Sequence, residues 1–235
     1  MKSLSRVAAC LLALVALVGC ASTTVSQRQV YQGERIARPD RIIVHDFAAT
    51  PADLPAWSAA AGLYASSNPP QDPAVLEIGR KLGAQVAQDL VAEIRAMGLP
   101  AVRAAAQPAP RVGDLVIIGY FASLDEGSAA KRMVLGFGSG AAEMTTQVEG
   151  YLMTDRGLRK LGSGAVDAGG GKTPGVAVPL AVAVATANPI GLIVGGAVKV
   201  GGEVTGKSTI EGTAKRTAEK IAADLRVAFQ KQGWI

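Results

Sequence analysis

The chain has 235 residues, of which 49% are apolar and 18% are charged. This composition excludes a disordered protein, and the length suffices to bury one core of ordinary size, so we expect one globular domain with a tail. The formal charge is +5, and aromatic residues make up only 4% of the chain. Nucleic-acid binding is not expected, because it needs a strongly basic surface and aromatic side chains on which bases stack.

The N-terminal residues have the pattern of a secretory leader. Residues 7–18 form an uninterrupted apolar run, which is too short for a permanent membrane helix but typical of a signal peptide. The run ends in the motif LVGCA at 17–21, which resembles a bacterial lipobox. We therefore predict a signal peptide over 1–19 and lipidation of Cys20. The alternative is an ordinary secreted protein in which Cys20 lies near the cleavage site by chance.

Lipidation has consequences for the cysteines and for localisation. Two or three acyl chains on Cys20 would anchor the protein in a membrane, because each buried methylene contributes about 0.8 kcal/mol. Since Cys10 leaves with the signal peptide, no cysteine would remain for a disulfide, a metal site or a nucleophile. An alanine directly after the modified cysteine, here Ala21, resembles the pattern of lipoproteins sent to the outer membrane. We therefore expect a protein that is lipid-anchored on the periplasmic face of the outer membrane. Residues 20–36 are polar and aperiodic, and we predict a flexible tether there.

Residues 37–235 alternate strand and helix patterns, which predicts a single periplasmic domain of the α+β class. A helix is expected where apolar residues recur at every fourth position from Ile78 to Ile94, with Gly98 as its stop. Residues 115–124 are apolar on both faces, as in a central strand. The full set comprises strands at 41–47, 99–103, 115–124, 133–137, 143–153 and 158–167, and helices at 73–97 and 211–232.

This set has the order β-α-β-β-β-β-β-α. It predicts a two-layer α/β arrangement, in which helices pack on a mixed, mostly antiparallel sheet. An apolar insertion precedes the last helix.

Residues 48–72 hold four prolines, with Trp57 and Tyr64 between them. A long segment of this kind often runs over the surface and carries binding contacts. Trp57 and Tyr64 are therefore predicted partner contacts. The alternative is that these aromatic side chains only fasten the segment to the domain.

The apolar insertion at 175–200 contains no charge from Val176 to Val198. As helices, it would align small residues at every fourth position, which permits close contact in a membrane or an oligomer. These residues are Ala183, Ala187, Gly191 and Gly195. As strands, its two arms have about the length of membrane β-strands, roughly 9 to 11 residues. The third alternative is an apolar hairpin that packs on the sheet of its own domain.

The motifs that would indicate catalysis are incomplete in this sequence. The Gly171-Lys172-Thr173 triplet lacks the upstream glycine of a phosphate-binding loop, and a proline follows it. His45 is the only histidine, which is too few for an ordinary zinc site. Acidic residues precede glycines in predicted turns, where turn formation explains them. We therefore expect no enzyme activity, no metal and no cofactor.

The segment KRMVLGFGSG at 131–140, between a predicted strand and a strand of alternating polarity, resembles bacterial lipoproteins grouped as domain of unknown function 4410. This resemblance spans most of residues 40–232 and implies a shared fold without catalytic residues. The element order and the late apolar insertion are also distantly similar to periplasmic lipoproteins related to the curli secretion channel and to activators of cell-wall synthases.

The resemblances imply two functions. In the first, the domain contacts an envelope protein during envelope assembly or export. In the second, the chain is a subunit of an oligomeric secretion pore that inserts residues 175–200 into the membrane. A pore predicts that deletion of 175–200 abolishes a homo-oligomer, whereas a binding module predicts damage to folding or no effect.

Overall fold

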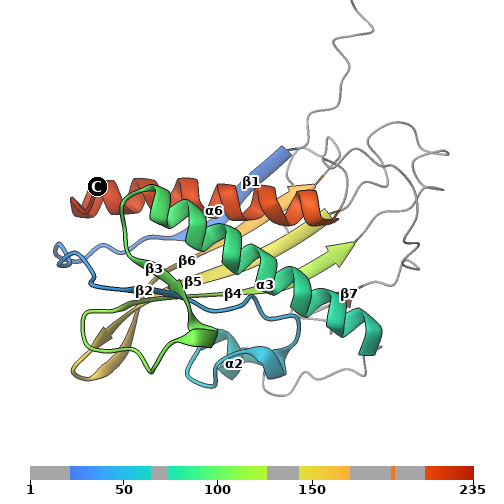
Figure 1. The fold of residues 1–235 in the computed structure, drawn as a ribbon, viewed down its shortest axis with the longest axis horizontal. Helices are drawn as coiled ribbons and strands as arrows, with labels where there is room; N and C mark the ends of the chain where they lie inside the picture. Colours follow the sequence, from blue (N-terminus) through green and yellow to red (C-terminus); the bar gives the residue numbers. More distant parts are fainter. Residues whose placement is uncertain (1–21, 65–72, 126–142, 170–191, 194–209) are drawn as a thin grey trace, which may run out of the picture.

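Helices α3 (Pro73–Ala96) and α6 (Ile210–Gln232) lie side by side on one face of a mixed sheet in this computed structural model (Figure 1). The structure describes residues 22–64, 73–125, 143–169, 192–193 and 210–235. The strands are β1 (Ser22–Gln29), β2 (Ile42–Val44), β3 (Ala101–Arg103), β4 (Leu115–Asp125), β5 (Glu143–Thr154), β6 (Gly157–Gly169) and β7 (Leu192–Ile193). The short helix α2 (Ala59–Tyr64) and the 3-10 turns η1 (Pro51–Asp53) and η2 (Ala104–Ala106) complete the described elements.

The sheet has the order β1-β6-β5-β4-β2-β3, with β7 paired to β4 beyond the end of β2. Strands β4, β5 and β6 form an antiparallel meander, and β1 adds antiparallel to β6. The pairs of β2 with β3, β2 with β4 and β4 with β7 are parallel. A mixed, mostly antiparallel sheet covered by helices confirms the predicted α+β class.

Strand β4 lies in the middle of the sheet, as its sequence predicts. Leu115 and Ile117 point into the core under the helices, whereas Val116 and Ile118 belong to a second cluster on the opposite face. Side chains of a strand alternate between the two faces, so a strand covered on both faces is apolar throughout.

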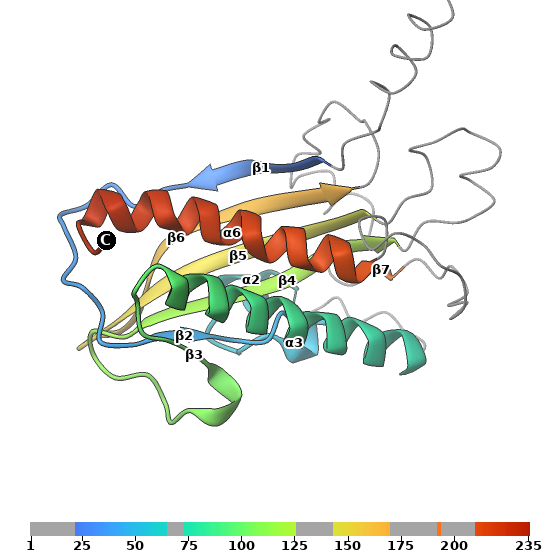
Figure 2. The same ribbon diagram turned by 45° about the horizontal axis from the view of Figure 1, so that its top comes forward.

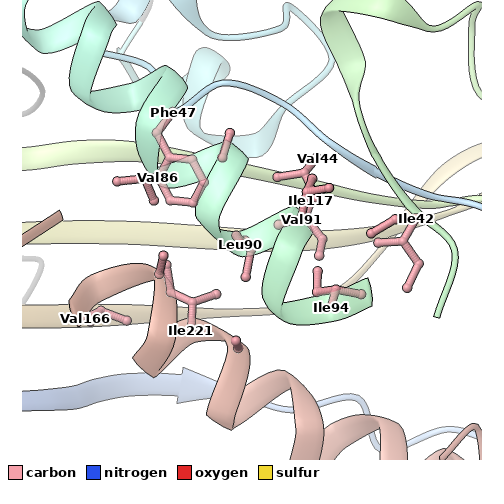
Figure 3. Packing of buried hydrophobic residues seen from close by; sticks show 14 of the residues in the cluster. Ile42, Val44, Phe47, Val86, Leu90, Val91, Ile94, Ile117, Val166 and Ile221 are labelled. Carbon is pink, nitrogen blue, oxygen red and sulfur yellow. The ribbon is translucent and has the colours of Figure 1, made fainter. Parts of the chain in front are cut away.

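The main core lies between the sheet and the two long helices (Figure 3). Leu90 and Ile94 of α3 are fully buried against Ile42 and Val44 of β2, and Ile221 of α6 faces the same core. The apolar stripe of α3 is therefore buried against the sheet, as its four-residue spacing predicts. The helix ends before Gly98, whose φ of 80° is the left-handed conformation that glycine adopts readily.

The close approach of α3 to the chain after β2 depends on Gly83. The Phe47 amide donates a hydrogen bond to the Gly83 carbonyl at 3.2 Å. A Cβ atom at Gly83 would lie 1.9 Å from the Phe47 carbonyl oxygen, a distance at which the backbone must shift. The helix is thus seated on this segment through backbone contact that a side chain would prevent.

The structure differs from the expected tether at 20–36. Residues Ser22–Gln29 form β1, which pairs with β6 from Ser22↔Gly169 to Ser26↔Ala165 before the register shifts. The polar sequence of β1 did not predict a strand. Because β1 lies at an edge of the sheet, one inward apolar residue, Val25, is enough to contact the core. The segment between β1 and β2 is also attached to the domain, since the Trp234 indole donates a hydrogen bond to the Ile36 carbonyl at 2.9 Å.

Other predicted elements agree with the structure or lie outside it. The strands expected at 99–103, 143–153 and 158–167 correspond to β3, β5 and β6, and the helix expected at 211–232 is α6. The strand expected at 41–47 corresponds to β2, which is shorter than expected and is the second strand along the chain instead of the first. The strand expected at 133–137 lies outside the described residues.

The contact at Gly83 makes a prediction about stability. Replacing Gly83 with alanine should lower the free energy of unfolding by about 1–3 kcal/mol, because the new methyl group meets the Phe47 backbone. Helix propensity alone predicts a gain of about 1 kcal/mol. Urea unfolding followed by circular dichroism measures the sign.

The exposed Ala92 on the same helix provides the matched control. Ala92→Gly should lower stability by about 1 kcal/mol through propensity alone. A Gly83→Ala variant more stable than the native protein would contradict the contact.

Candidate functional site

The termini of four strands are aligned at one end of the sheet, where β1 and β5 begin and β4 and β6 end. Ser22 pairs with Gly169, Gly169 pairs with Glu143, and Glu143 pairs with Asp125. Helix α6 also begins at this end, as Figure 2 shows. We call this row the Ser22 end of the sheet. Cys20 precedes Ser22 by two residues in the sequence, so the Ser22 end is the part of the domain next to the predicted lipid.

Several predicted site residues lie outside the described residues. These are Cys20, Ala183, Ala187, Gly191 and Gly195. Of the apolar insertion at 175–200, the structure describes Leu192–Ile193, which pairs with Ser123 and Leu124 of β4. In the described part of the chain, no helix combines the length and the apolar character needed to cross a membrane.

Trp57 lies on the face of the sheet opposite to α3 and α6. Its ring contacts His45 edge-on, with centroids 5.7 Å apart, and Tyr151 edge-on at 5.3 Å. The side chain is still 40% exposed. Trp57 therefore fastens the 48–64 segment to the sheet while part of its side chain stays exposed. Tyr64 ends α2, and its side chain is not among those described.

A polar network under Trp57 was not expected from the sequence. Glu149 is only 5% exposed, and its carboxylate accepts hydrogen bonds from the Tyr151 hydroxyl at 2.8 Å and from the Lys160 ammonium at 2.6 Å. The Tyr151 oxygen in turn accepts a hydrogen bond from the Ala59 amide at 2.9 Å. The network thus joins β5 and β6 to the start of α2.

Burial is the main reason that the pKa of Tyr151 lies above its ordinary value. One carboxylate oxygen of Glu149 accepts from the Tyr151 hydroxyl that binds Ala59 of the 48–64 segment, and the other accepts from Lys160 of β6, so both oxygens already have partners within the domain. The alternation along β5 places Glu149 and Tyr151 on one face, but only the position of the 48–64 segment shows that this face is covered. The alternation of polar and apolar residues along a strand does not predict that a segment distant in the sequence covers one face of it.

His45 and Asp46, neighbours in the sequence, have different partners. The Asp46 carboxylate pairs with the Arg103 guanidinium at 2.6 Å, while the His45 ring lies against Trp57. Burial lowers the pKa of His45, and the nearby Asp46 charge opposes that shift. Over the described ranges, no group of three or more His, Cys, Asp and Glu side chains is arranged to hold a metal ion.

The titration of His45 predicts how stability depends on pH. Because the folded pKa is lower than the ordinary 6.5, protonation favours the unfolded state. The contribution of neutral His45 is present above 6.5 and is lost as the pH falls through the folded pKa. The urea midpoint should therefore drop between about pH 7.5 and pH 5.5.

His45→Gln should flatten the urea midpoint over this pH range, because glutamine does not titrate. His45 is the single histidine of the chain, so its imidazole signal in NMR gives the folded pKa directly. An equal loss of stability in the variant, or a folded pKa above 6.5, would show that the assignment is wrong.

The sequence model described as "Domain of unknown function (DUF4410)" matches residues 42–187. No curated protein matches the sequence. The PelC dodecamer from Paraburkholderia phytofirmans is similar to this chain at 13% identity and a TM-score of 0.40, over 84% of this chain and 95% of that chain.

A variant of the same PelC dodecamer is 15% identical with a TM-score of 0.36, over 72% of this chain and 92% of that chain. These TM-scores are too low to assign an assembly or an activity to this protein. The family match is of another kind, because it covers more than half of the chain and includes β2, β3, the meander and α3. The protein therefore belongs to the family described as domain of unknown function DUF4410.

Proposed function

We propose that this protein is an envelope lipoprotein, anchored through Cys20 in the outer membrane, whose periplasmic domain acts through protein contacts in envelope assembly or export. The observation that carries the proposal is the pairing of Ser22 with Gly169, two residues after the lipobox cysteine. A strand that starts so close to the anchor leaves the domain directly at the bilayer surface.

The length of the link sets the geometry. Two residues span at most about 7 Å when fully extended. Strand β5 has 12 residues and runs away from the Ser22 end, so the turn at Asp155–Arg156 lies roughly 40 Å from it along the strand. The domain would thus stand on the membrane with one end down. A protein partner would meet a surface of defined height and orientation.

The aromatic cluster on the outer face supports protein contact over catalysis. Trp57 contacts the rings of His45 and Tyr151 and remains 40% exposed. These properties suit a contact residue whose position is set before binding. Glu149, the buried carboxylate beside it, already accepts two hydrogen bonds. We therefore propose a binding module rather than an enzyme.

The pairing of Leu192–Ile193 with β4 supports this choice over a pore subunit. This dipeptide lies inside the 175–200 insertion, and its backbone continues the sheet of its own domain at the position that β2 leaves free. A membrane hairpin would pair with neighbouring subunits instead.

Fatty-acid labelling tests the anchor. Cells that produce the protein and take up a clickable fatty acid should yield a labelled, processed chain. Cys20→Ala should abolish the label and leave a longer precursor, because the lipobox can no longer be modified and cut. Mass spectrometry and gel fluorescence measure both results.

Cys10→Ala is the matched control, since Cys10 lies inside the predicted leader. This variant should keep both the label and the processed length. Label that persists in Cys20→Ala, or that disappears in Cys10→Ala, would refute the anchor at Cys20.

A further inference from the structure

An apolar cavity of about 180 Å³ lies between α6 and the β1 side of the sheet. Strands β1, β4, β5 and β6 form its floor, and the C-terminal half of α6 covers it. Its apolar lining includes Val25, Val148, Leu161, Leu225, Phe229 and Trp234. Of these six, Val25, Val148, Leu161 and Leu225 are only partly buried, although all of them contact the main core. The layers are therefore incompletely filled here.

Three glycines lie on the floor of this cavity, and two of them, Gly150 and Gly164, leave space above them. Gly150 of β5 pairs directly with Gly162 of β6, and Gly164 follows on the same face. A Cβ atom at Gly150 would have nothing within 4 Å, and one at Gly164 would meet only Val25 at 3.9 Å. Gly162 is different, because a Cβ there would lie 2.5 Å from the Gln29 carbonyl oxygen of β1.

The glycine at 150 is thus not required by the packing of the fold. Glycine inside a strand lowers stability, and it often marks a place where a ligand approaches the backbone. A left-handed backbone does not explain it, since Gly150 is not among the described glycines with positive φ. Gly150 does border the register shift between β5 and β6, and glycine is common beside such irregularities. The register shift accounts for a glycine at this position, but it does not fill the free space above Gly150.

The rim of the cavity is polar and carries more positive than negative charge. Arg28 and Lys231 line it together with one carboxylate, that of Asp224. The Arg28 guanidinium lies 3.9 Å from the Asp224 carboxylate, donates a long hydrogen bond of 3.4 Å to the Asp224 carbonyl, and belongs to a side chain that is 42% exposed. An ion pair this long and this exposed is weak, so Arg28 can turn to another anion.

We propose that this cavity binds one alkyl chain of an anionic amphiphile, with the carboxylate of a fatty acid as the simplest head group at Arg28 and Lys231. An apolar cavity of about 150 Å³ holds benzene, so about 180 Å³ holds roughly six to eight carbon atoms. Cavities that take small ligands combine an apolar interior with a few polar groups that orient the ligand, and this one has that arrangement.

Photo-crosslinking with the full chain in polymer-bounded native membrane discs tests the proposal without detergent. The probe is decanoic acid that carries a diazirine near its methyl end. It should label peptides of β6 around Leu161 to Val166 and of α6 around Ile221 to Phe229. Unlabelled decanoate should compete for this label.

Gly150→Leu fills the cavity and should reduce this labelling at least tenfold, because each methylene shut out weakens binding about fourfold. Its thermal midpoint should equal or exceed the native value. Gln147→Leu, which adds the same side chain on the same strand but on the opposite face, should label as the native chain does. If Gly150→Leu does not fold, Gly150→Ala should still weaken labelling about fourfold.

Replacing Arg28 and Lys231 by glutamine tests the head group. The double variant should lose its preference for decanoic acid over an equally long photoreactive alcohol. Equal labelling of native protein and Gly150→Leu, or no labelled cavity peptide in the native chain, would overturn the proposal. A native chain that binds acid and alcohol equally well would overturn the assignment of the rim.

Discussion

The antiparallel pairing of β1 with β6 is the interaction on which the proposed orientation of the domain on a membrane depends. It draws the N-terminal segment into the sheet at Ser22 and aligns the ends of four strands in one row. Without it, residues after the predicted lipid would form a tether of up to 16 positions, and the domain could turn freely. With it, the distance from Cys20 to the folded domain is two residues.

The same end of the sheet is where other parts of the chain leave the described fold. Strand β4 ends at Asp125, β6 ends at Gly169 and α6 begins at Ile210, so the sequences between these elements begin or end at the Ser22 end. One of them includes the stretch without charges from Val176 to Val198. In the proposed orientation, this apolar sequence and the lipid are attached to the same end of the domain. The opposite end, with the Asp155–Arg156 turn, would face away from the bilayer.

Much of the fold could be predicted because its central elements bury apolar residues with a clear period. The four-residue step of α3 and the two-sided apolar pattern of β4 each have one structural solution in a two-layer domain. Strand β1 could not be predicted in this way. It is polar, it lies at an edge, and its place depends on backbone pairing with a strand about 140 positions later in the chain.

The sites were harder to predict than the fold for a related reason. The proline-rich surroundings of Trp57 predict a contact residue, but its partners His45 and Tyr151 come from β2's end and from β5, and only the tertiary structure joins them. The cavity depends on the register that places Gly150 opposite Gly162, and a shift of one residue would close it. Sequence composition shows many glycines without showing which of them share a face.

Energy transfer from the domain to the membrane tests the orientation most directly. If Cys10 is removed and Cys20 is lipidated, the mature protein has no free thiol, so single cysteines can be added for labelling. Glu211→Cys places a donor at the Ser22 end, and Arg156→Cys places one at the far turn; both positions are exposed. In vesicles with acceptor-labelled head groups, we expect strong transfer from position 211 and weak transfer from position 156, because about 40 Å separates the two ends. Equal transfer from both positions would contradict the account, since it would mean that the domain has no fixed orientation on the membrane.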